Sequence, residues 1–233
     1  MLFGKLKSTY YIIKANRAYA AGNTEGTLNY LGKAYTSGAA KGSVVTTYGY
    51  LLLKQGRLDE ATKIFEEQLI SPKATNNELN NINSNYALCL WKQGKLDEAI
   101  SILENTIKTY KNTNIYGSLG YLYNLKGDLE KALRFNLEAL DYNATSGVIL
   151  DNLGQTYYLL DDQRNANEVF SKLMSQSPKF PEAYYDYALV LEKQGDSEKA
   201  IEMLKKAQEL KPNYLSGVTK ADIDNKLSEL TSR

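Results

Sequence analysis

The sequence predicts an all-α protein built from about six helix–turn–helix repeats, and two observations carry this prediction. Nearly the same eight residues occur twice, as KQGRLDEA at residues 54–61 and as KQGKLDEA at residues 92–99. The glycine of this motif recurs along the chain, with an aspartate replacing it once, at spacings of 34, 38, 33, 34 and 34 residues. A fixed period of this length is the signature of stacked structural repeats. The recurring positions are Gly22, Gly56, Gly94, Gly127, Asp161 and Gly195.

Small residues recur in the same register as the glycines. Counting back fourteen residues from each motif position places the repeats' first residues near 8, 42, 80, 113, 147 and 181. The eighth place of every repeat is then alanine or glycine, and the twentieth place is alanine in all but the first repeat, which has Thr27. Because small side chains let two helices approach closely, both places mark helix crossings.

Each repeat is predicted to contain two helices joined at the motif glycine. The first half has apolar residues at helical spacing, as in Leu150, Leu153 and Tyr157. Glycine ends that helix at little cost because it tolerates the left-handed conformation. Acidic residues such as Asp97 and Glu98 follow, where they suit the positive end of a new helix. A single helix pair cannot bury its apolar face, so neighbouring repeats must stack.

The pattern W/Y-x-x-L-G-x-x-Y…A-x-x-x-F…P resembles the tetratricopeptide repeat family. The resemblance covers residues 8–213 and implies a right-handed superhelical α-solenoid. The repeat that begins at Gly147 carries the pattern in register, at Leu153, Gly154, Tyr157, Ala166, Phe170 and Pro178.

Three segments depart from the repeat pattern. The second repeat has four extra residues within SPKATNNEL (71–79), which we expect to form a loop. The first repeat has Lys14 and Thr27 where Leu or Tyr and Ala are usual, so a true repeat and an N-terminal cap both remain open. Near the C-terminus, Ile223, Leu227 and Leu230 form an apolar stripe. We therefore expect a solenoid over residues 1–213 and a C-terminal capping helix within residues 214–233.

Composition argues against catalysis and against a general nucleic-acid surface. The chain has no histidine, and Cys89 is its single cysteine, so we expect no enzyme, no cofactor and no metal site. The net charge is +1, but it is uneven: residues 1–58 carry +7 and residues 59–233 carry −6. No stretch is long and apolar enough to span a membrane, and the apolar run YYII stops at Lys14, so a cytoplasmic location is expected.

The family resemblance implies that the first helix of each pair lines a concave groove. A carboxylate clamp, which relatives build with Lys and Asn, is not expected, because Ser84 and Leu88 hold those places in the third repeat. The residues at the sixth place of the repeats resemble an incomplete ladder of asparagines, whose side-chain amides could hydrogen-bond a peptide main chain. The simpler interpretation is a polar face in contact with solvent. The candidate groove residues are Thr47, Tyr50, Asn85, Leu88, Trp91, Ser118, Tyr121, Asn152, Gln155, Tyr158, Tyr185 and Asp186.

These features favour a non-catalytic protein-interaction scaffold that binds an extended partner segment in the groove. Tyrosines there would contact apolar side chains of the partner. Basic side chains of the partner would be favoured by four acidic residues of the groove, Asp151, Glu182, Asp186 and Glu192. We expect Asn85 and Asn152 to face solvent, so that alanine at both would weaken binding without lowering stability.

Two alternatives stay open. The basic, amphipathic N-terminus could mediate weak self-association through Leu2, Phe3, Leu6, Tyr10 and Ile13. Binding of RNA by a helical solenoid is the weaker alternative, because the expected groove has few basic residues, and we expect no nucleic-acid partner.

Overall fold

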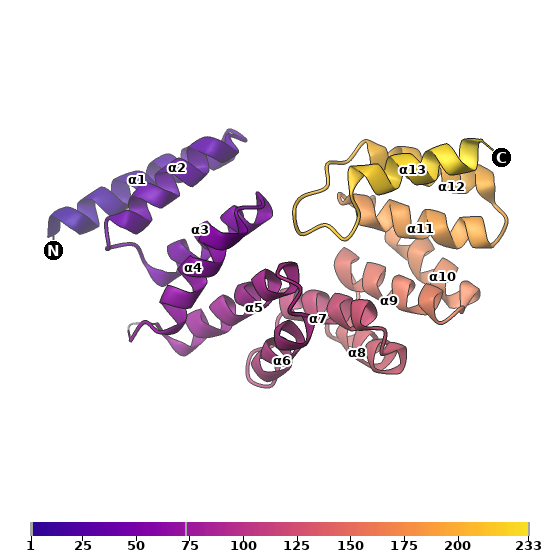
Figure 1. Ribbon diagram of the computed structural model, residues 1–233, viewed down its shortest axis with the longest axis horizontal. Coiled ribbons are helices and arrows are strands. Elements are labelled where there is room, and N and C mark those ends of the chain that lie inside the picture. The colour runs from indigo at the N-terminus through magenta and orange to yellow at the C-terminus, as the bar shows by residue number, and fades with distance from the viewer. Residues whose placement is uncertain (1, 73, 233) are drawn as a thin grey trace. The chain divides into compact units, whose positions relative to one another are not determined.

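The computed structural model describes residues 2–72 and 74–232, together with all side chains in that part except those of Leu2 and Phe3. The described residues form thirteen helices and no strands, and short turns join the helices into pairs (Figure 1). The all-α prediction is confirmed. The helices are α1 Leu2–Ala20, α2 Thr24–Thr36, α3 Gly42–Lys54, α4 Leu58–Leu69, α5 Asn76–Lys92, α6 Leu96–Ile107, α7 Thr113–Lys126, α8 Leu129–Tyr142, α9 Gly147–Leu159, α10 Gln163–Met174, α11 Pro181–Lys193, α12 Ser197–Gln208 and α13 Lys220–Thr231.

The chain divides into two compact parts, which we call the N-terminal block (Met1–Thr106) and the C-terminal block (Ile107–Arg233). The N-terminal block holds α1 to α5 and most of α6, and the C-terminal block holds α7 to α13. Each block has its own packed helices, so each is described separately below.

All six predicted helix breaks are confirmed by the backbone. The five motif glycines have φ between 70° and 83°, and Asp161 has φ 64°. This left-handed conformation suits glycine and is tolerated by aspartate better than by most other residues, which explains why Asp161 can replace glycine once. Its carboxylate also lies 2.6 Å from Lys193 Nζ, on the first helix of the next repeat.

The small residues lie at close helix crossings, as their register predicts. Ala132 is fully buried. A β-carbon added to Gly154 would lie 2.6 Å from Cε2 of Phe170, and one added to Gly49 would lie 2.7 Å from Cζ of Phe65. Both rings are fully buried, so the eighth place has no room for a larger side chain.

The extra residues of the second repeat differ from the expectation. We expected a loop over residues 71–79, but α5 already begins at Asn76, so much of the insertion lengthens a helix. Thr75 starts this helix through a capping box: its hydroxyl accepts from the backbone N–H of Glu78, and the Glu78 carboxylate accepts from the Thr75 N–H at 2.9 Å. The pair T-x-x-E is the sequence signal for this start.

The first repeat has both of its helices, α1 and α2. Thr27, at the place where alanine is usual, is buried, and its hydroxyl donates to the carbonyl oxygen of Asn23 at 2.7 Å. Satisfying the hydroxyl within its own helix lets threonine replace alanine here. One face of α1 exposes three large apolar side chains, Leu6, Tyr10 and Ile13.

At the C-terminus, Thr219 and Asp222 form a second capping box at the start of α13. Ile223 and Leu230 are buried against the last helix pair. Lys226 also pairs with Glu192 of α11 at 2.7 Å. Helix α13 thus lies within the segment for which a capping helix was expected, and it covers the apolar side of α11 and α12.

Candidate functional site

In the C-terminal block, the first helices of successive repeats form one continuous layer. Helix α7 packs beside α9, and α9 packs beside α11, whereas the second helices α8 and α10 pack between first helices. We call the surface of α7, α9 and α11 that faces away from the second helices the inner face. Side chains from three repeats therefore meet on this face.

One tyrosine from each of these three helices lies on the inner face. Tyr121 of α7, Tyr158 of α9 and Tyr185 of α11 are all half-buried. Burial raises the pKa of Tyr121 and of Tyr185, and neighbouring carboxylates raise both further. The phenols of Tyr121 and Tyr185 are therefore neutral at physiological pH, and all three tyrosines offer an apolar ring with a polar tip.

Two buried carboxylates lie among these tyrosines. Asp151 and Asp186 are each 8% exposed, and Gln155 donates to Asp186 Oδ2 at 3.4 Å. Burial, followed by repulsion from Glu182, raises the pKa of Asp186 to about 7. Burial and repulsion from Asp186 and Glu182 also raise the pKa of Asp151 well above its ordinary value. A cation brought to this place would stabilise the charged forms of both.

Asp151 also has an unsatisfied oxygen. Its Oδ1 is buried and has no hydrogen-bond partner among the described residues. A buried acceptor without a donor costs free energy comparable to a lost hydrogen bond. A hydrogen-bond donor placed against Oδ1 would therefore be favourable.

Asn152 does not face solvent, so the expectation that it does is wrong. It is 2% exposed, and its Nδ2 donates to the carbonyl oxygen of Gly117 at 2.7 Å, which joins α9 to α7. In return, Asn124 of α7 donates from its Nδ2 to the Asn152 carbonyl oxygen at 2.9 Å and to Gln155 Oε1 at 3.1 Å. The amide of Asn152 is thus used inside the protein.

This contact belongs to a buried polar network that the repeat pattern does not predict. The Thr156 hydroxyl lies 2.7 Å from Asn124 Oδ1, and Asn136 Nδ2 donates to Thr156 at 3.0 Å. Asn136 is fully buried and packs against Gly120. The other repeats have phenylalanine or leucine at the place that Asn136 occupies, and the next repeat has Phe170 there. A polar residue at this apolar place was the signal in the sequence.

In the N-terminal block, α3 and α5 pack side by side and carry the other candidate residues. Thr47 is exposed, and its hydroxyl donates to the Ser43 carbonyl oxygen of its own helix at 2.9 Å. Asn85 is half-buried, and its Nδ2 donates to the Asn81 carbonyl oxygen at 3.0 Å. Tyr50, Leu88 and Trp91 are also half-buried. Ser118 is half-buried as well, but belongs to α7 of the C-terminal block. The proposed ladder is therefore not a row of equivalent free amides.

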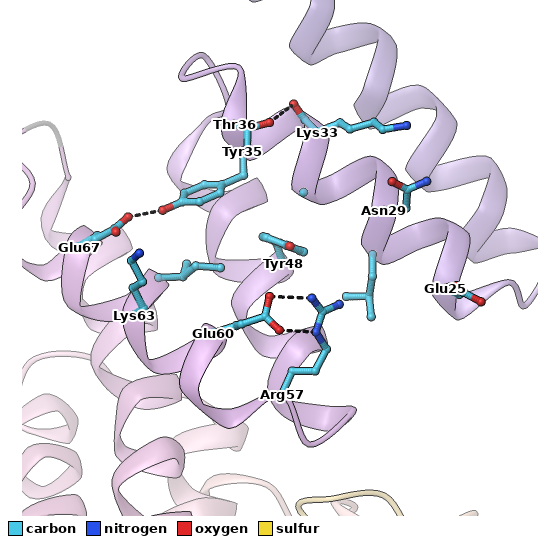
Figure 2. A pocket seen from close by; sticks show the side chains of 13 residues that line it. Glu25, Asn29, Lys33, Tyr35, Thr36, Tyr48, Arg57, Glu60, Lys63 and Glu67 are labelled. Carbon is cyan, nitrogen blue, oxygen red and sulfur yellow. Dashed lines mark hydrogen bonds and ion pairs between the residues drawn. The ribbon is translucent and has the colours of Figure 1, made fainter.

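A cavity of about 730 Å³ lies elsewhere in the N-terminal block, at residues that the repeat pattern does not mark. It is bordered by α2, α3 and α4, and charged side chains line it (Figure 2). Arg57 donates twice to Glu60 at 2.6 Å, and Tyr35 donates to Glu67. These four polar side chains are thus paired with one another within the protein.

Cys89 is fully buried, and burial raises the pKa of its thiol to about 11, so the reactive thiolate is scarce at neutral pH. No cluster of three or more His, Cys, Asp or Glu side chains in the described part of the chain has metal-binding geometry. Likewise, no helix there combines the length and the apolar character needed to cross a membrane.

Comparison with known proteins points to one repeat family. Models of the tetratricopeptide repeat match residues 85–146 and residues 181–214. No curated protein matches the sequence.

Three solved structures illustrate the similarity in fold. A tetratricopeptide repeat protein from Parabacteroides merdae has 15% identity and a TM-score of 0.56, with 98% of this chain and 100% of that chain covered. TTC0263, a thermophilic protein of Thermus thermophilus, has 20% identity and a TM-score of 0.67, with 83% and 100% covered. The pilF protein of Pseudomonas aeruginosa has 14% identity and a TM-score of 0.66, with 97% and 99% covered. At these identities, the likeness concerns the fold.

Proposed function

Because the chain belongs to the tetratricopeptide repeat family, whose fold generally mediates protein–protein interaction, we propose that it is a non-catalytic scaffold. It binds an extended segment of a partner protein along its first helices. The single observation that carries this proposal is the row of half-buried tyrosines, Tyr121, Tyr158 and Tyr185, on three successive helices of the inner face.

The spacing of these helices suits an extended peptide. Packed helices lie about 8–10 Å apart, and an extended chain advances about 3.3 Å per residue. One tyrosine would therefore meet the partner at about every third residue. Each ring provides a large, rigid contact area with a hydrogen-bonding tip, which is typical of residues that dominate binding energy.

The buried carboxylates favour a partner with basic as well as apolar residues. Asp151 Oδ1 lacks a donor within the described structure, and Asp186 has only the long contact from Gln155. A lysine or arginine side chain would supply the missing donor and the opposite charge. Glu192 contributes less, because it already pairs with Lys226.

The side-chain amides of the first helices are assigned different roles, because some are buried and others lie at the surface. Asn152 holds α9 to α7 and acts on binding through that support, while Gln155 remains at the edge of the inner face. In the N-terminal block, Tyr50, Leu88 and Trp91 are proposed as further apolar contacts, with Thr47 and Asn85 beside them as polar ones. A cytoplasmic location is part of the proposal, since the only cysteine is a buried thiol.

Selection from a random peptide library on the immobilised protein tests the proposal. We expect the wild type to retain peptides that combine apolar and basic residues. Tyr158→Ala and Tyr185→Ala should each weaken binding of a selected peptide by roughly tenfold, because each removes an aromatic contact worth about 1–2 kcal/mol. Leu137→Ala, on the outer helix α8 and 40% exposed, is the matched control. Equal binding by all four proteins would show that the inner face is not the site.

A second candidate function is favoured by α1. Leu6, Tyr10 and Ile13 are exposed by 63%, 55% and 47%, and they lie on one face of a helix that also carries Lys7 and Lys14. Such a basic, apolar helix face suits contact with an acidic surface of a second copy, and weak self-association would follow. The side chains of Leu2 and Phe3, which were expected to share this face, lie outside the described residues.

A further inference from the structure

The segment that joins α12 to α13 is unusually long for a link between repeats. It covers residues 209–219, and we call it the strap. The links between repeats at residues 108–112, 143–146 and 175–180 are much shorter. Figure 1 shows the strap as a wide excursion between α12 and α13. A direct connection between adjacent antiparallel helices does not require this length.

The strap reaches the inner face. Gly217 lies directly against the phenol of Tyr121: an added β-carbon would overlap the hydroxyl oxygen and lie 3.1 Å from Cζ. Tyr121 belongs to α7, whereas the strap starts and ends at α12 and α13, so the strap reaches back to a first helix two repeats earlier. Next to this contact, Val218 is buried and belongs to a cluster that Tyr185 packs against. The strap thus touches Tyr121 and contributes Val218 to the cluster against which Tyr185 packs.

The tip of the strap is ordered by its own hydrogen bonds. The backbone N–H of Ser216 donates to the Asn213 carbonyl oxygen at 2.9 Å, and that of Leu215 donates to Asn213 Oδ1 at 2.9 Å. Pro212 precedes this turn and restricts the backbone further. A preordered turn loses little conformational entropy when it lies on the inner face.

The composition of the strap matches the partner proposed above. It carries Lys211 together with Tyr214, Leu215 and Val218, and so combines basic and apolar residues. It still leaves Asp151 Oδ1 without a donor. It is therefore an incomplete occupant, and a partner segment that also supplies a cation to Asp151 would bind better.

Resting on the proposed function, we propose that the strap occupies part of the inner face in the free protein and that a partner segment binds by displacing it. The strap then lowers the affinity of every partner in proportion to the fraction of molecules in which it is closed. A partner must therefore bind the inner face strongly enough to displace the strap, and a segment with both apolar and basic residues is best suited to do so.

Two variants test this inference with the library peptides. In the first, two glycines replace residues 213–217, which shortens the strap but keeps Val218. In the second, Tyr214→Ser with Leu215→Ser keeps the length and removes two large apolar side chains of the strap. If the strap is closed in roughly nine-tenths of molecules, the shortened variant should bind a given peptide about tenfold more tightly, and the serine variant should lie between it and the wild type. Ile70→Ser, at an 85% exposed residue in the N-terminal block, is the control for loss of an apolar side chain from a link.

Hydrogen exchange supplies the second readout. On peptide binding to the wild type, amides of residues 213–218 should exchange faster while those of α7, α9 and α11 exchange more slowly. If wild type and shortened variant bind equally and the strap amides do not change, the strap inference is wrong and the proposed function stands. If neither protein retains any peptide, both are wrong. If only the shortened variant retains peptides, the inference is supported in its strongest form.

Discussion

Replacing Asn152 by alanine should destabilise the C-terminal block, although the residue was first expected to face solvent. The change removes the hydrogen bond from Nδ2 to the Gly117 carbonyl oxygen, which is 2.7 Å long and buried. A hydrogen bond contributes about 0.5–1.5 kcal/mol net, and the space left by the buried side chain adds a further cost. We expect a total loss of roughly 1–3 kcal/mol.

Two spectroscopic probes together show which of the two blocks the substitution destabilises. Trp91 is the only tryptophan and belongs to the N-terminal block, so its fluorescence reports unfolding there. Far-UV circular dichroism reports helices in both blocks. Asn152→Ala should lower the thermal midpoint seen by circular dichroism by roughly 3–10 °C and change the Trp91 transition less.

Asn85→Ala is the matched control, because it removes the same amide from the N-terminal block. The Asn85 side chain donates only to Asn81 of its own helix and is half-buried. Its loss should therefore cost less than about 0.5 kcal/mol. If the two single variants are equally stable, Asn152 does not join α7 to α9, and the packing described for the inner face is wrong.

Four further expectations follow from individual residues. Because the pKa of Asp186 is raised to about 7 in the folded protein, the unfolded chain loses this proton first as the pH rises. Stability should therefore fall from about pH 4 to pH 7, and Asp186→Asn should flatten that fall in thermal melts between pH 5 and pH 8. Ala132→Leu should overpack a fully buried crossing and cost roughly 1–3 kcal/mol in urea unfolding, whereas unchanged stability would mean that the repeat register is wrong. Asp161→Gly should be at least as stable as the wild type and Asp161→Ala less stable, because φ is 64° there and the exposed ion pair with Lys193 contributes little. Self-association through α1 should appear as concentration- and salt-dependent sedimentation that Tyr10→Ser abolishes, and a monomer under all conditions would exclude it.

The repeat architecture could be predicted because its determinants are local and recur. A left-handed residue must end each first helix, and a small residue must lie at each close crossing. Gly154 beneath Phe170 shows the second requirement, and Asp161 shows that the first can be met without glycine. Helix α5 begins several residues before the repeat register predicts, because the capping box of Thr75 and Glu78 starts a helix within the insertion.

The inner face was harder to predict because position in a repeat does not fix exposure. Asn85 and Asn152 occupy the same place, yet Asn152 is buried, since Gly120 and Asn136 in the preceding repeat leave room for a polar network. The strap was also missed. Its contact with Tyr121 joins residues almost one hundred positions apart, and no periodic pattern in the sequence reports such a contact.

Hydrogen exchange of the whole chain with and without a library-selected peptide tests the central claim most directly. Binding on the inner face predicts slower exchange in α7, α9 and α11, centred on the turns of helix that carry Tyr121, Tyr158 and Tyr185, with little change in α8, α10 and α12. Protection confined to the second helices, or to α1, would contradict the account and move the binding surface elsewhere.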